Sequence, residues 1–160
     1  MIATIRTHAN GNSHYLCDLD LMKFSEEQVR ERMRERGISD DAFFICGFKD
    51  WGIDSILSLR EAYMLKLQIE HLYDGDDYLI RFMLRSRKSL YDIETHYYKF
   101  FSKDELAVMQ HLLKHAETAP LLEAFFRAGS WVNFMLAYVE AGYILNTPRG
   151  FYLDGNVFKI

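Results

Sequence analysis

Alternation of apolar and polar residues opens the chain and predicts a β-hairpin. The segment IATIRTH (2–8) alternates weakly and is rich in β-branched residues, and HYLCDLDL (14–21) alternates again. Asn10-Gly11 lies between them, and this dipeptide favours the tight turn that joins two antiparallel strands. A short apolar run, AFFICGF (42–48), predicts a buried third strand.

Capping signals predict a helix between the second and third strands. Ser25 is followed three residues later by Gln28, which is the spacing of a capping box, and Gly37 provides a stop. Val29 and Met33 lie one turn apart on this helix, so we expect them to face the core. The first fifty residues therefore predict a β-β-α-β order, a small sheet with one helix across it.

Further helix-start signals follow the loop KDWGID (49–54). Ser58, Ser89 and Ser102 each begin a capping box, with an acidic residue three positions later, and Asp76 or Asp77 can cap another helix. Pro120 suits the first turn of a helix that ends near Gly129. The predicted helices cover 58–73, 77–87, a segment from 89, 102–115, 120–129 and 130–141.

The end of the chain returns to short extended runs. They are YILN (143–146), GFYL (150–153) and NVFKI (156–160), with turns at Pro148–Gly150 and at Asp154-Gly155. The sequence thus predicts an α+β fold. It has an N-terminal β-β-α-β lobe (1–52), a helical middle lobe (53–101) and a small C-terminal lobe with helices and short antiparallel strands (102–160).

Composition supports a folded core and a cytoplasmic location. Apolar residues make up 49% of the chain and aromatic residues 15%. No apolar run reaches the roughly 20 residues that span a bilayer, and the start lacks the order of a signal peptide. Cys17 and Cys46 fit a reducing compartment as two small buried residues, and a disulfide would require neighbouring strands.

Charge is modest overall but unevenly distributed. The net charge of −4 argues against a generic nucleic-acid binder. Seven acids and only two bases lie between Asp50 and Ile80, and the only basic block follows at 81–88. Arg81, Arg85 and Lys88 lie on one helical stripe, which could follow a phosphate backbone or neutralise the acidic segment before it.

Motifs for catalysis or metal binding are weak. His111 and His115 have the spacing of a zinc helix, but Leu112 stands where a metalloprotease needs glutamate, which favours two surface histidines. Asp18 and Asp20 share a strand face, a common feature of edge strands. Nucleophile elbows and phosphate-binding loops are absent from the sequence. We therefore expect no enzyme, no cofactor and no metal.

Two features bear on binding instead. On the helix at 25–36, Glu27, Glu31 and Glu35 recur every four residues opposite Val29, about 6 Å apart. Adjacent phosphates of a DNA strand are separated by about 6–7 Å. Four arginines are interleaved, so a solvated mixed-charge face is the alternative. In THYYKFF (95–101), the helical spacing of the aromatic residues predicts a core face rather than a base-stacking surface.

Several segments together resemble the ArdA antirestriction family. They are IATIRTHANGNSHYLCDLDL, AFFICGFKD, SLREAYMLKLQIEHL, YDIETHYYKFFSKDELAVMQHLL and AYVEAGYILNTPRGFYLDGNVFKI, which cover nearly the whole chain in order. The resemblance implies an elongated, multi-lobed protein that imitates DNA and blocks type I restriction–modification enzymes in the bacterial cytoplasm. It also implies no cofactor, no direct contact with nucleic acid, and homodimers formed through the later helices.

On this hypothesis, carboxylates imitate phosphates in each lobe. The candidates are Asp18, Asp20, Glu27, Glu31 and Asp50 in the first lobe, Asp54, Glu61, Asp74, Asp76 and Asp77 in the second, and Asp92, Glu94, Asp104 and Glu105 in the third. Two alternatives stay open. One is a module of a phage or mobile element that inhibits another defence system through apolar contacts without mimicry, and the other is a single-stranded nucleic-acid binder.

Overall fold

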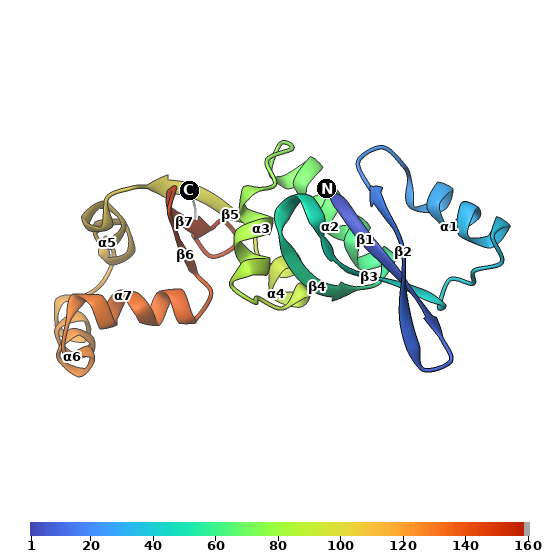
Figure 1. Ribbon diagram of the computed structural model, residues 1–160. Helices are drawn as coiled ribbons and strands as arrows, with labels where there is room; N and C mark the ends of the chain where they lie inside the picture. Colours follow the sequence, from blue (N-terminus) through green and yellow to red (C-terminus); the bar gives the residue numbers. More distant parts are fainter. Residues whose placement is uncertain (159–160) are drawn as a thin grey trace. The chain divides into compact units, whose positions relative to one another are not determined.

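A computed structural model describes residues 1–158 and shows a mixed α+β fold (Figure 1). The chain forms two compact units, Met1–Glu94 and Thr95–Ile160. The elements of the first unit are β1 (Ile2–Ala9), β2 (Asn12–Asp20), α1 (Glu26–Glu35), β3 (Phe43–Phe48), the 3₁₀ turn η1 (Lys49–Trp51), β4 (Ile53–Leu57), α2 (Leu59–Leu72), α3 (Tyr78–Arg85) and α4 (Leu90–Thr95).

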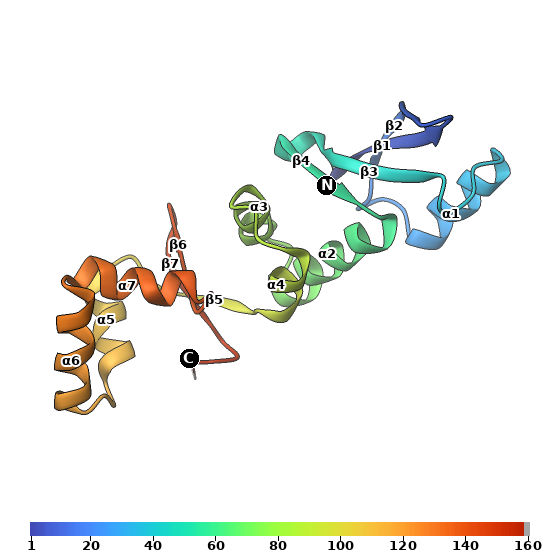
Figure 2. The same cartoon turned by 90° about the horizontal axis from the view of Figure 1, so that it is seen from below.

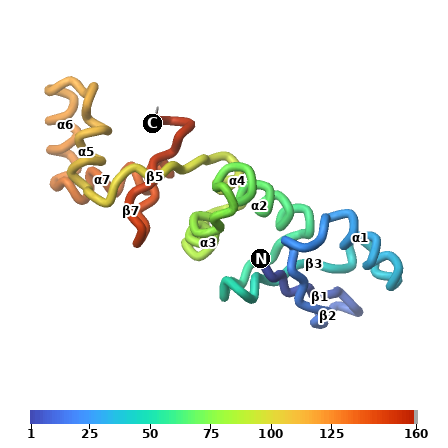
Figure 3. The backbone as a smooth tube through the Cα atoms, turned by 90° about the horizontal axis from the view of Figure 1, so that it is seen from above, coloured from blue at the N-terminus to red at the C-terminus, as the bar shows by residue number. Residues whose placement is uncertain are grey.

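The predicted hairpin is confirmed. Strands β1 and β2 pair antiparallel from Ile2↔Asp20 to Ala9↔Asn12, with a bulge after Ile5. Asn10 and Gly11 both have positive φ, 50° and 79°, as the tight hairpin turn requires. The tube in Figure 3 can be followed from this hairpin through α1 into β3.

The first unit contains one strand that the sequence pattern does not predict. Four antiparallel strands lie in the order β2-β1-β3-β4, so β4 forms an edge of the sheet. It begins at Ile53, within the segment KDWGID that the pattern assigns to a loop. The sheet therefore continues past residue 52, where the predicted first lobe ends.

Helices α1 and α2 begin at the predicted capping boxes. Ser25 and Ser58 each accept a hydrogen bond from the third helical N–H, and the side chain three residues later bonds back to the capping N–H. Both helices lie on the same side of the sheet (Figure 2). The Tyr63 hydroxyl donates to the Phe24 carbonyl oxygen at 2.7 Å, and burial raises the pKa of Tyr63 to about 12. This bond ties α2 to the segment that leads into α1.

The core of the first unit forms where the sheet meets these helices. Val29 and Met33 of α1 are buried, as predicted from their spacing. The other buried apolar side chains include Ala3, Ile5, Leu21, Phe43, Ile45, Phe48, Trp51, Ile53, Leu57, Leu59, Ala62, Leu65, Ile69, Leu79, Ile80, Met83, Leu84 and Ile93.

The second unit has a three-stranded antiparallel sheet in the order β5-β7-β6. Helices α5 and α7 pack against this sheet, and α6 packs against α7. Its elements are β5 (Tyr98–Ser102), α5 (Glu105–Leu113), α6 (Thr118–Ala128), α7 (Trp131–Glu140), β6 (Ile144–Thr147) and β7 (Gly150–Asp154). Helices α6 and α7 match the predicted spans. Gly129 ends α6 with φ 76°, and Ser130 caps α7 through the Asn133 N–H.

Two predictions in the second unit are wrong. The aromatic segment 98–102 is strand β5 rather than helix, with Tyr98 buried and Phe100 52% exposed. Ser102 therefore belongs to β5, and Asp104 caps α5 instead by accepting from the Leu106 N–H at 3.0 Å. The predicted last strand, NVFKI, is a turn and a bend at 156–158, and its last two residues lie outside the described part.

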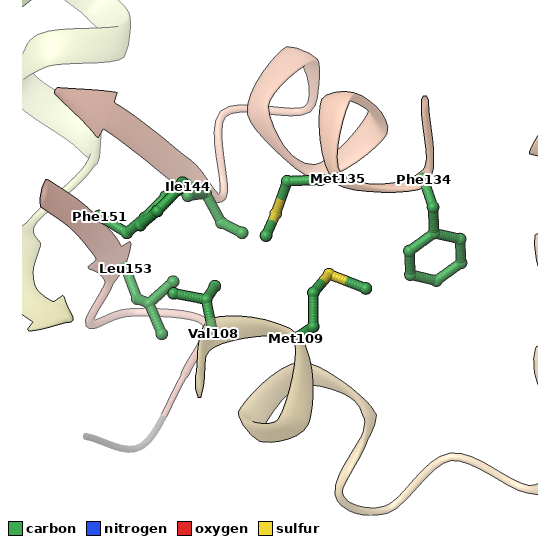
Figure 4. Close-up of a cluster of buried hydrophobic side chains, with 7 residues drawn as sticks. All are labelled: Val108, Met109, Phe134, Met135, Ile144, Phe151 and Leu153. Carbon is green, nitrogen blue, oxygen red and sulfur yellow. The ribbon is translucent and has the colours of Figure 1, made fainter. Parts of the chain in front are cut away.

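Seven buried side chains form the core of the second unit (Figure 4). Val108 of α5, Ile144 of β6 and Leu153 of β7 point toward one another, and Met109 faces Met135 of α7. Phe134 and Phe151 complete the cluster. No side chain of α6 is among the seven, and α6 has no buried residue.

Candidate protein-binding surfaces

The outer side of α1 carries the clearest row of carboxylates. Glu27, Glu31 and Glu35 are exposed, while Val29 and Met33 on the opposite side are buried. Within residues 1–158, none of these three glutamates makes an ion pair or a side-chain hydrogen bond. The structure therefore leaves this row available to a cationic partner.

The neighbouring flank of α1 is neutralised internally. Glu26 pairs with Arg30 at 2.7 Å and with Arg60 at 3.7 Å. Asp40 pairs with Arg34 at 3.1 Å and with Arg30 at 3.6 Å, and the hydrogen bond from Arg34 lowers the pKa of Asp40. Arg30 and Arg34, two of the four arginines interleaved with the glutamates, thus pair with Glu26 and Asp40 and not with the glutamate row.

Asp20 and Asp50 converge on the start of the chain. The N-terminal ammonium of Met1 lies 2.8 Å from Asp50 and 3.9 Å from Asp20. Burial acts to raise the pKa of Asp50, but hydrogen bonds from this ammonium and from the Ile2 N–H lower it overall. Both carboxylates are matched by a cation inside the fold.

Asp18 is also occupied. Lys49 lies 2.7 Å from one of its oxygens, and the Thr4 hydroxyl donates to the other at 2.9 Å. The hydrogen bond from Lys49 is the main cause of the lowered pKa of Asp18. These contacts join β2, β1 and η1, so Asp18 serves the structure of the sheet.

The predicted acids at 74–77 differ from one another. Asp74 is exposed at φ 51°, a left-handed conformation that aspartate tolerates better than most residues. Asp76 accepts a hydrogen bond from the Tyr78 N–H at 3.0 Å. Asp77 accepts from the Trp51 indole N–H at 2.9 Å and also pairs with Arg81 at 2.9 Å. Asp77 therefore anchors the buried Trp51, a role that the sequence pattern does not indicate.

The remaining candidates are spread over both units. Asp54 is exposed on the edge strand β4, and Glu61 completes the capping box of α2. Asp92 accepts from the Ser89 hydroxyl at 2.7 Å. The other candidates are Glu94, half-buried in α4, and two exposed residues at the start of α5, Asp104 at the cap and Glu105 in the first turn.

Two of the four residues of the basic block, Arg81 and Arg85, have side-chain partners within the first unit. Arg81 pairs with Asp77, and an Arg85 guanidinium N–H donates to the Trp51 carbonyl oxygen at 2.7 Å. These contacts lie on the predicted stripe of Arg81, Arg85 and Lys88. The observation favours the interpretation that the block neutralises its acidic neighbourhood over a nucleic-acid contact.

The second unit exposes apolar surface that the sequence analysis did not single out. On α6, Leu122 is 61% exposed and Phe126 is 86% exposed, while Leu121 and Ala128 pack toward the core. We call Leu122 and Phe126 the α6 outer face. The sequence already contains this pattern of apolar residues. Leu121 and Phe125 lie four residues apart, and so do Leu122 and Phe126, so one helix carries two apolar stripes.

A second apolar feature lies between α5 and α7. This groove has a volume of about 570 Å³ and is lined by Leu106, Met109, Leu113, Trp131 and Val132 together with Glu105 and Gln110. We call it the α5–α7 groove. Apolar surface of this kind marks sites of protein association more often than chance exposure does.

The histidine and cysteine motifs have ordinary structural explanations. His111 lies beside the Phe101 ring with ring centroids 4.7 Å apart, and His115 is exposed. Cys17 on β2 and Cys46 on β3 are half-buried free thiols, and β1 separates their strands. Residues 1–158 contain no group of three or more His, Cys, Asp or Glu side chains placed to hold a metal ion.

Comparison of the chain with protein-family models, with curated proteins and with solved structures gave no match. Every helix in the described part of the chain is too short or too polar to cross a lipid bilayer.

Proposed function

We propose that this chain is a non-enzymatic antirestriction protein that occupies the DNA-binding site of a type I restriction–modification enzyme. The observation that carries the proposal is the row Glu27, Glu31 and Glu35. It is exposed, regularly spaced and, among the described residues, free of internal cations. Repulsion between like charges four residues apart costs a helix about 0.2–0.5 kcal/mol per pair, which a purely structural helix has no reason to retain.

The distribution of internal ion pairs supports a division of labour among the candidate carboxylates. Asp18, Asp20, Asp50 and Asp77 hold the first unit together and are matched by nearby cations. We therefore assign the phosphate-like role first to the row Glu27, Glu31 and Glu35, and next to the exposed Asp54, Asp74 and Glu105. A DNA-binding groove attracts such groups by its summed positive field, so binding should weaken as salt rises.

Protection of unmodified phage DNA in cells tests the proposal. Unmodified phage is plated on a strain that carries a type I enzyme, with and without expression of the chain. We expect expression to raise the plating efficiency toward that of a strain without the enzyme. Unchanged restriction at confirmed expression of folded protein, across several type I enzymes, would contradict the proposal.

We further propose that the protein forms homodimers through the α6 outer face. A helix in a folded unit normally buries one apolar stripe, yet α6 buries no residue completely and exposes Leu122 and Phe126. A second copy would cover this surface. We expect light scattering to give the mass of a dimer for the unmodified chain and of a monomer for Phe126→Ser, with matching circular dichroism. A monomer for both proteins would refute dimerisation.

The α5–α7 groove favours one alternative function, a module that inhibits a different host defence protein through apolar contacts. Its walls are Leu106, Met109, Leu113, Trp131 and Val132. Affinity for the host protein that barely changes between low and physiological salt would favour this alternative, because charge mimicry weakens as screening grows.

A further inference from the structure

The first unit also has a hollow, which lies between β2 and the flank of α1 that faces this strand. Its volume is about 190 Å³. Leu19, Phe24, Val29 and Met33 supply apolar walls, and the rim is formed by Gln28, Arg32 and Arg36. We call it the α1–β2 groove.

The positive charge on its rim is not paired with any carboxylate among residues 1–158. Arg32 and Arg36 make no ion pair within residues 1–158, unlike Arg30 and Arg34 on the other flank of the same helix. The guanidinium carbon of Arg32 lies 5.9 Å from the centre of the Phe24 ring, so this side chain is positioned over an apolar wall. The rim therefore presents two available guanidinium groups one helical turn apart.

The acids nearest the groove do not cancel that charge. Asp18 lines it but is paired with Lys49 at 2.7 Å. Glu31 and Glu35 line a neighbouring polar hollow that shares Phe24, Gln28 and Arg32 with the α1–β2 groove. Within the described residues, neither glutamate forms an ion pair with Arg32. Arg32 and Arg36 are therefore charged groups of the α1–β2 groove with which no carboxylate among residues 1–158 forms an ion pair.

Cys17 of β2, a half-buried free thiol, also lines the α1–β2 groove. Burial raises the pKa of Cys17, while the positive charge of Arg36 acts in the opposite direction with the smaller effect. Arg36 lines the groove together with Cys17. A ligand must therefore combine an apolar body with a carboxylate at its edge.

Size decides between a free small molecule and a protein segment. A volume of about 190 Å³ is below the roughly 300–1,000 Å³ of typical small-molecule sites but suits one aromatic or branched side chain. Arginine forks recognise carboxylates through paired hydrogen bonds. We propose that the α1–β2 groove docks an acidic segment of a partner protein, with one apolar anchor side chain between Val29 and Phe24 and flanking carboxylates on Arg32 and Arg36.

This surface differs from the glutamate row, for which we propose a cationic partner on the adjacent side of the same helix. Gln28, Arg32 and Arg36 form one column, and Glu27, Glu31 and Glu35 form the next. The groove would therefore bind acidic groups, whereas the row would bind cationic groups. The test of the groove does not depend on the proposed antirestriction activity.

A synthetic peptide provides the probe. Acetyl-Gly-Glu-Phe-Glu-Gly-amide is titrated into the isotope-labelled full chain, and methyl chemical shifts of Val29 and Met33 are followed by NMR. We expect saturable shift changes at both methyls, with little change at the methyls of Ile144 and Leu153 in the other unit. Absence of shift changes at millimolar peptide would overturn the proposal.

Charge variants separate the groove from general attraction. Arg32→Gln with Arg36→Gln should weaken peptide binding by about tenfold or more. The matched control, Arg30→Gln with Arg34→Gln, removes the same charge from the other flank of α1 and should leave affinity within about twofold. Equal losses for the two double variants would show a non-specific charge effect and would overturn the assignment.

Peptide variants and a free acid complete the test. Replacing the peptide phenylalanine by alanine, or its glutamates by lysines, should abolish the shift changes. Phenylacetate at equal concentration should bind more weakly than the peptide. If phenylacetate binds as tightly as the peptide, the groove is a small-molecule site and the assignment to a protein segment is wrong.

Discussion

Neutralising the α1 glutamate row should weaken inhibition and stabilise the protein at the same time. The variant Glu27→Gln, Glu31→Gln, Glu35→Gln keeps side-chain size and helix propensity, and none of the three carboxylates has a partner to lose among the described residues. Binding and folding should therefore respond in opposite directions, which a general disturbance of the structure could not produce.

The expected magnitudes follow from exposure and spacing. An exposed ion pair contributes about 0.2–1 kcal/mol, so the loss of three contacts costs about 0.6–3 kcal/mol of binding, or roughly 3- to 150-fold in affinity. Removing two like-charge pairs at i, i+4 relieves about 0.2–0.5 kcal/mol each, so the free energy of unfolding should rise by about 0.4–1 kcal/mol.

Fluorescence anisotropy of labelled duplex DNA bound to a purified type I enzyme measures the inhibition constant, and urea unfolding measures stability. The matched control is Glu70→Gln, Glu123→Gln, Glu140→Gln, which changes net charge equally at positions outside the row. It should inhibit within about twofold of the unmodified chain. A row variant that inhibits as tightly as this control would show that the glutamate row does not contact the enzyme.

Three further predictions concern the fold. Ser58→Ala removes the α2 capping bond and should lower the free energy of unfolding by about 1 kcal/mol in urea titrations. Lys49→Met removes the main cause of the lowered pKa of Asp18. The stability that comes from the lowered pKa of Asp18 is present above pH 3.8 and is lost as pH falls through the pKa of the folded state. The variant lacks this stability, so it should begin to unfold in acid at a higher pH than the unmodified chain. Circular dichroism during acid titration measures the difference. Gly47→Ala places a Cβ against the Ile53 carbonyl oxygen and should destabilise by about 1–3 kcal/mol or prevent folding, whereas wild-type stability would contradict the strand packing.

Much of the fold could be predicted because local signals agreed with the tertiary structure. The Asn10-Gly11 turn set the hairpin, and Ser25 and Ser58 set two helix starts. Each signal is short-range, since a turn dipeptide or a capping box stabilises its conformation within four or five residues. The positions of Val29 and Met33 followed from helical period alone.

The two missed strands lacked a local signal. In β4, Gly52 ends the 3₁₀ turn with positive φ, and only pairing with β3 makes the following residues a strand. In β5, the aromatic residues at 98–101 suit a helix or a strand, and pairing with β7, about fifty residues later, decides between them. Long-range pairing of this kind cannot be inferred from a short window.

The candidate carboxylates could be found in sequence, but their internal partners could not. Asp77 pairs with Arg81 within one helix turn, which spacing can suggest, yet its bond to Trp51 crosses 26 residues. Asp50 meets the N-terminal ammonium from 49 residues away. Among the candidate carboxylates, only the glutamate row of α1 could be predicted to be exposed from helical period alone, because Val29 and Met33 occupy the opposite, buried side of the helix.

If the chain imitates DNA, it must compete with DNA for one site on the type I enzyme. The chain is titrated onto the immobilised enzyme, alone and with saturating duplex DNA that carries the recognition sequence, at low and at physiological salt. We predict binding that is lost when DNA is present and that weakens as salt rises. Formation of a ternary complex, with equal affinity for the free and the DNA-bound enzyme, would contradict DNA mimicry.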